Sequence, residues 1–154
     1  MDLKYKIPTL TELKLELNYG PILRGEVLSP EKLGLSFEAK VRLDKSGRID
    51  FFLHNAYFLK NENTDGVQLF HGDYLISIDI EGLNKRVKKK EIPQNMLAHL
   101  LGMSILMLRG AVSIRLSQSP LSAFNLPILN PLEILKTKLI VKDDKFVLEE
   151  NRKY

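Results

Sequence analysis

The sequence predicts an α+β domain: a four-stranded antiparallel sheet with a long helix and a short C-terminal helix packed on one face. Three observations predict it. Four strand-like segments come first, a long apolar helix pattern follows, and a short helix introduced by proline comes last. Strands that precede helices, rather than alternating with them, favour an antiparallel sheet covered on one side. We expect the strands to follow one another as a meander.

The strands are indicated by period-two alternation and by composition. Leucines alternate with charged or polar residues over residues 13–17, and apolar and polar residues alternate again over residues 37–43. Residues 49–59 are rich in aromatic and branched side chains, and a polar turn separates them from a fourth strand over residues 67–80. Alternation of this kind predicts strands that are buried on one face only.

The long helix is expected over residues 92–116, and it is apolar almost all round. One small sheet covers only one side of such a helix, so the other side predicts a partner subunit in a symmetric homo-oligomer. The alternative is a helix fully buried in its own monomer. We do not expect membrane insertion, because the uncharged stretch is shorter than about 20 residues and contains polar side chains. The residues expected at the oligomer interface are Met96, Leu100, Met103 and Met107.

Two irregular segments are more apolar than ordinary loops. Residues 20–34 have turn-forming residues at both ends and several leucines, isoleucine and valine inside, and residues 120–131 contain three prolines that exclude helix and central strand. The first segment is interpreted either as one wall of an apolar groove or as a lid that closes the core, and the second as an extended apolar ribbon that must rest on another surface. Asn130 and Pro131 then cap and begin the short helix, which is expected to end near residue 138.

Composition excludes several classes of protein. The chain has no cysteine, which excludes disulfides, thiolate metal sites and a cysteine nucleophile. The amino terminus shows no secretory signal, so we expect a cytoplasmic protein. Length and a hydrophobic content of 44% predict a single domain over residues 1–154, with its core at about 10–138 and a tail at 139–154 that could add a hairpin.

The net charge of +4 is concentrated in one loop. Its basic residues are Lys85, Arg86, Lys88, Lys89 and Lys90. A solvated turn before a buried helix is the simpler interpretation. The alternative function is an oligomeric nucleic-acid-binding or adaptor protein that uses the loop at 85–90, although no aromatic residue between 82 and 94 is placed to stack on bases.

The order of these pieces, with its loop-rich crossover after the first strand, resembles the SecB family of export chaperones. The local matches are Val-Arg-Leu-Asp at 41–44, Ile-Asp-Ile-Glu-Gly at 78–82, Ile-Leu-Met-Leu-Arg at 105–109 and Phe-Asn-Leu-Pro-Ile-Leu-Asn-Pro at 124–131. The resemblance spans roughly residues 10–138. SecB proteins are typically acidic and dock the SecA motor through an acidic sheet surface, so the positive net charge of this chain speaks against SecA docking.

The resemblance implies a holdase that forms a dimer of dimers through the long helix, rather than an enzyme. It implies apolar grooves for unfolded or partly folded polypeptides, serving protein export or one labile partner, and no cofactor. The segments at 20–34 and 120–131 are then the groove walls. The expected polypeptide-binding residues are Ile22, Leu23, Val27, Leu28, Phe124, Leu126 and Ile128.

No enzyme motif can be assembled from the remaining polar residues. His54 and His71 lie on strands that could be neighbours, where Asp50 or Asp73 could complete a metal site. Histidines on strands are usually hydrogen-bonded or solvent-facing, so no metal is expected. His99 is expected to make a polar contact at the oligomer seam. Arg109 is expected to pair with a carboxylate at the interface or to reach solvent.

Overall fold

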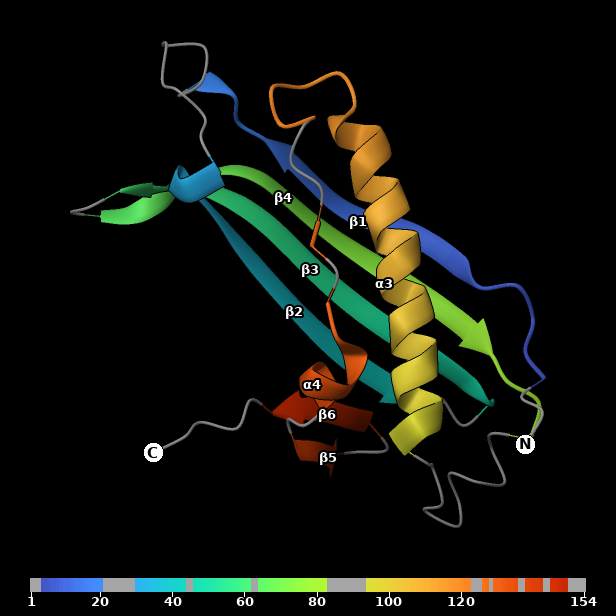
Figure 1. The fold of residues 1–154 in the computed structure, drawn as a ribbon. Helices are drawn as coiled ribbons and strands as arrows, with labels where there is room; N and C mark the ends of the chain where they lie inside the picture. Colours follow the sequence, from blue (N-terminus) through green and yellow to red (C-terminus); the bar gives the residue numbers. More distant parts are fainter. Residues whose placement is uncertain are drawn as a thin grey trace.

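The computed structural model describes residues 4–20, 30–43, 46–61, 64–82, 94–122, 126–127, 129–135, 138–142 and 145–149. Figure 1 shows one sheet with the long helix laid along it. The α+β prediction is confirmed. The expected hairpin is present: β5 (Lys138–Lys142) pairs with β6 (Lys145–Glu149), and β6 contacts β2.

The four strands of the sheet are β1 (Thr9–Leu17), β2 (Leu33–Leu43), β3 (Arg48–Asn61) and β4 (Thr64–Asp79). Every neighbouring pair is antiparallel and the order is β1-β4-β3-β2. The meander prediction is therefore wrong for the first strand, which pairs with β4 and not with β2. The connection from β1 to β2 is long enough to cross from one edge of the sheet to the other, whereas the turns on either side of β3 hold β2, β3 and β4 as neighbours. The crossover ends in a short 3₁₀ helix, η1 (Pro30–Lys32), that leads directly into β2.

The alternation predicted for β1 is interrupted by a bulge. The register shifts between Glu12, which pairs with Tyr74, and Lys14, which pairs with Asp73, so Leu13 is the extra residue. Leu13 and Leu17 are exposed while Leu15 is half-buried. A bulge adds one residue to one strand only, and the simple period-two prediction fails at Leu13 because of it.

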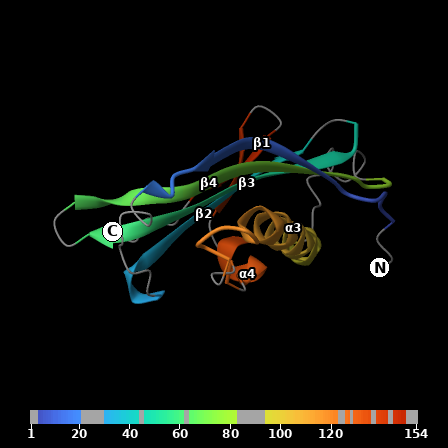
Figure 2. The ribbon, with the colours of Figure 1, turned by 90° about the horizontal axis from the view of Figure 1, so that it is seen from above.

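Helices α3 (Gln94–Leu116) and α4 (Pro131–Leu135) lie on the same side of the sheet, as Figure 2 shows. Gly102 allows the two helices to approach closely, because a Cβ atom at this position would lie 3.1 Å from Cγ of Pro131. The Asn130 carbonyl accepts backbone hydrogen bonds from Glu133 and Ile134 and begins α4 as predicted, although α4 ends three residues earlier than residue 138.

The core lies between α3 and one face of the sheet. The largest fully buried side chains of β3 and β4 are Ile49, Phe51, Leu53, Leu69, Phe70, Tyr74, Ile76 and Ile78, and those of α3 are Leu100, Leu101 and Leu108. By length and composition alone, the stretch Asn95–Leu116 could also cross a bilayer, a test that core helices of soluble proteins pass as well. The expectation that this helix does not enter a membrane stays a prediction.

Candidate functional site

The two sides of α3 are used differently. Leu100 is fully buried and Met96 is 7% exposed, and both belong to the core cluster of their own chain. The prediction that they form an oligomer interface is wrong, because the apolar pattern runs round the helix and does not say which side meets the sheet. Met103 and Met107, also predicted there, lie half-buried at the border of the covered side.

The side of α3 that faces away from the sheet carries an apolar stripe. Leu106 is 64% exposed and Ile114 is 75% exposed, and Gly110 lies exposed between them. Residues four apart share one side of a helix. A Cβ atom at Gly110 would meet nothing within 4 Å, so packing in the described chain gives no reason for a residue that costs a helix about 1 kcal/mol. We call Leu106, Gly110 and Ile114 the outer stripe.

An open apolar depression of about 490 Å³ lies beside the amino-terminal half of the outer stripe. Helix α3 supplies most of the lining, the amino-terminal segment supplies Tyr5, and the approach to α4 supplies Leu129 and Pro131. Met103 and Leu106 belong to its wall, which gives the surface side chains that can adapt to different apolar partners. His99 lines the depression and is exposed on α3, and its expected polar contact at an oligomer seam stays a prediction.

Arg109 has a structural task that the sequence did not predict. Its Nε donates a hydrogen bond to the carbonyl oxygen of Leu126 at 3.0 Å, which ties the linker to α3. The side chain of Leu126 is 2% exposed and belongs to the core, so the prediction that Leu126 lines a polypeptide groove is wrong.

The charge of Arg109 also acts on Tyr57. Burial raises the pKa of Tyr57 to about 12, although the positive charge of Arg109 acts in the opposite direction.

The other predicted groove residues, Ile22, Leu23, Val27, Leu28, Phe124 and Ile128, lie outside the described residues. The basic loop at 85–90 lies outside them as well. These predictions therefore stay predictions. The outer stripe was missed although its four-residue spacing is visible in the sequence, because an equally regular apolar pattern continues on the buried side.

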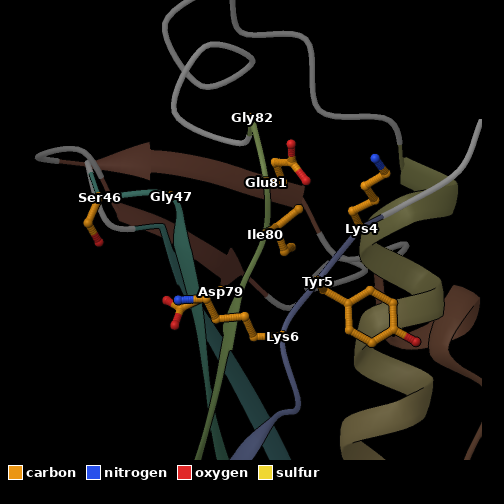
Figure 3. A pocket seen from close by; sticks show the side chains of 9 residues that line it. All are labelled: Lys4, Tyr5, Lys6, Ser46, Gly47, Asp79, Ile80, Glu81 and Gly82. Carbon is orange, nitrogen blue, oxygen red and sulfur yellow. The ribbon is translucent and has the colours of Figure 1, made fainter.

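A second, polar depression of about 630 Å³ lies where the amino-terminal segment joins the end of β4 (Figure 3). Tyr5 forms a bridge with Ile80, and the Lys6 amide donates to the Asp79 carbonyl at 3.0 Å. Its described lining carries both signs of charge, from Lys4 and Lys6 and from Asp79 and Glu81. Such a balance gives no net attraction for phosphate groups, and the surface lends no support to nucleic-acid binding.

The sheet face away from α3, here the far face, carries a buried carboxylate. Asp50 is fully buried and accepts hydrogen bonds from Arg42 Nε at 3.0 Å and from Ser77 Oγ at 2.7 Å, and Arg48 Nε lies 3.2 Å from it. The two arginines thereby balance the negative charge of Asp50, and the hydrogen bonds satisfy its oxygens, as a buried charge requires. Asp50 is not the residue that joins the two strand histidines. His54 and His71 are indeed neighbours, and Asp73 lies between them.

No protein-family model and no curated protein matches the chain. The features of the described chain that bear on function are therefore the outer stripe and the apolar depression beside it.

Proposed function

We propose that this protein is an oligomeric, SecB-like holdase that binds unfolded or partly folded polypeptides. The observation that carries the proposal is the apolar surface of α3, where Leu106 and Ile114 are exposed beside an apolar depression of about 490 Å³. Contiguous apolar surface of this kind is typical of interaction sites on proteins and is otherwise unfavourable in water. The resemblance of the order of elements to that of the SecB family is the reason for proposing unfolded polypeptides as the partner.

The amino-terminal half of this surface is assigned to the client. An unfolded chain exposes isolated apolar side chains without a fixed shape, so its receptor needs an open apolar hollow with adaptable walls. Tyr5, Met103 and Leu129 provide such walls around the depression. A client bound this way is held without being folded, and the binding delays its aggregation by mass action.

The carboxyl-terminal half is assigned to a second copy of the chain. Gly110 and Ile114 leave a smooth apolar strip on which a helix from a symmetric partner can approach closely. Association places several depressions on one particle, and one long client can then occupy more than one of them with increased avidity. SecA docking is not part of the proposal, because the chain is basic overall.

The test measures suppression of aggregation of a chemically denatured model protein, with light-scattering mass determined in the same sample. Tyr5→Glu is expected to abolish suppression while the mass of the oligomer stays unchanged. Ile114→Glu is expected to reduce the mass toward that of one chain and to weaken suppression at the same time. Leu17→Glu is the matched control, because it places the same charge on an exposed leucine of β1 and is expected to change neither quantity.

Absence of suppression by the wild-type protein at several-fold excess would contradict the holdase. A wild-type protein that suppresses aggregation as a monomer would contradict only the oligomeric part, the assignment of Gly110 and Ile114 to contact with a second copy. The two parts of the proposal are thus tested separately.

A further inference from the structure

Three side chains with metal-binding atoms meet on the far face of the sheet. His54 on β3 and Asp73 on β4 are direct cross-strand partners, and His71 precedes Asp73 by two residues and so lies on the same face. Nδ1 of His54 lies 2.7 Å and Nε2 of His71 lies 3.0 Å from the same carboxylate oxygen, Oδ1 of Asp73. The two rings meet edge to face with centroids 4.4 Å apart. We call these three residues the strand histidine cluster.

The geometry is close to that of a coordination site. One ligand atom from each of the three residues lies within 4.8 Å of the other two. Bonds of about 2.1 Å to a tetrahedral ion place ligand atoms about 3.4 Å apart. The distance from His54 to Asp73 would need to open by about 0.7 Å and that from His71 by about 0.4 Å, which side-chain rotation supplies without moving the strands.

A second carboxylate is placed to orient one of the rings. Glu16 on β1 is the cross-strand partner of His71, and its Oε2 lies 3.7 Å from Nδ1 of that histidine. This is the ring nitrogen opposite the one that faces Asp73. A carboxylate behind a metal-bound histidine commonly accepts the second ring N–H, and so fixes the tautomer that presents the other nitrogen to the ion.

The cluster is held firmly and is reachable from solvent. The side chains of His54 and Asp73 are 32% and 35% exposed and that of His71 is 14% exposed. The ligand atoms therefore lie on a paired part of the sheet that an ion in solvent can reach.

We propose that His54, His71 and Asp73 bind one divalent transition-metal ion, with Zn²⁺ as the representative of the class. Two imidazole nitrogens and one carboxylate oxygen suit this borderline class of ions better than Ca²⁺ or Mg²⁺, which prefer oxygen ligands alone. On binding, each imidazole presents an unprotonated nitrogen to the ion and carries its single proton on the other ring nitrogen. A proton that lies on the ligating nitrogen in the metal-free protein is exchanged through water to the other nitrogen, so each ring stays neutral. Water fills the remaining position, and Glu16 holds His71 in place.

The experiment titrates tag-free protein with Zn²⁺ by calorimetry and with Co²⁺ by visible absorption. One ion per chain is expected, with an increase in Tm on saturation because the ion binds the folded state. His54→Gln and His71→Gln are each expected to weaken binding by more than tenfold, and Glu16→Gln by about 10–100-fold. His99→Gln is the matched control and is expected to bind as the wild type does, since His99 lies on α3.

Ring ¹⁵N resonances of the wild-type histidines give an answer that does not depend on whether the variants fold. Zn²⁺ is expected to shift the ring resonances of His54 and His71 and to leave those of His99 unchanged. Absence of saturable binding below roughly 100 µM Zn²⁺ would overturn the proposal, as would a perturbation of His99 alone. Unchanged affinity in folded His54→Gln and His71→Gln proteins would overturn it as well.

Discussion

The two faces of the sheet are made by alternate residues of the same strands, yet they have little else in common. On the face toward α3, β3 places Ile49, Phe51 and Leu53 in the core. On the far face the same strand places Asp50 and His54 among charged and polar partners from β2 and β4. Because successive side chains of a strand point to opposite faces, one strand contributes both to the apolar core and to the polar contacts of the far face.

Helix α3 also has a buried side and an exposed side, but apolar residues occur on both, so no regular spacing in the sequence separates them. Leu108 is fully buried against the sheet, while Leu106, two residues away, is exposed. Both are leucines in one helix, so they differ only in what lies next to them. We therefore expect substitutions of buried side chains to lower the free energy of unfolding more than substitutions of exposed side chains on the same element.

The largest effect is expected from a pair of substitutions within α3. Leu108→Ala should lower the free energy of unfolding by about 2–5 kcal/mol, because it leaves a cavity in the core. Leu106→Ala should change it by no more than about 0.5 kcal/mol, since the side chain is mostly in solvent. Denaturant unfolding at low protein concentration measures both. Equal losses would mean that the outer stripe is covered in the free chain.

The next effect concerns the buried carboxylate of the far face. Asp50→Asn should lower the free energy of unfolding by about 2–3 kcal/mol, because charge-assisted hydrogen bonds from Arg42 and Ser77 are lost or weakened. Asp79→Asn is the control, an exposed aspartate on the neighbouring strand with an expected change within about 0.5 kcal/mol. A small loss for Asp50→Asn, measured by the same unfolding assay, would show that the network is not stabilising.

A smaller effect is expected from acid titration of the strand histidine cluster. The pKa of Asp73 is lower in the folded state than its ordinary value of 3.8, so ionised Asp73 stabilises the fold above that pH. This stabilisation is lost as the pH falls through the folded-state pKa. The stability difference between wild type and Asp73→Asn should therefore narrow below about pH 4, by less than about 1 kcal/mol because the side chain is partly exposed. Metal-free unfolding curves across pH measure it, and a difference that stays constant would contradict the prediction.

The smallest effect is expected at the exposed ion pair between Arg115 of α3 and Glu12 of β1. Arg115 Nε and Glu12 Oε2 are 2.9 Å apart, but the arginine side chain is largely in solvent. Water and salt screen such pairs, and ordering two long side chains costs entropy. Arg115→Ala should leave the Tm unchanged at both low and high salt. A salt-dependent loss would mean that this pair helps to fix α3 on the sheet.

The local pattern was sufficient to predict the class of fold and most elements. Strand periodicity and composition located β2, β3 and β4, and the Asn130-Pro131 cap located the start of α4, because these signals depend on residues close together in the chain. The same reasoning did not find the β1 bulge, since one extra residue changes pairing without changing composition. It also expected a meander, because a long crossover and a direct turn are equally compatible with the strands themselves.

Only the tertiary structure decided which apolar residues are covered and which polar residues meet. The sheet selects one side of an evenly apolar α3, which buries Met96 and Leu100 and exposes Leu106 and Ile114. The β3–β4 register brings His54 opposite Asp73, whereas Asp50, on the same strand as His54, lies opposite Ser77. A register shift of one residue would move either side chain to the other face, so this choice depends on the whole sheet and on the helix packed against it. The sequence by itself determined the elements and the amphipathic strands; their mutual placement determined the surfaces on which both proposals depend.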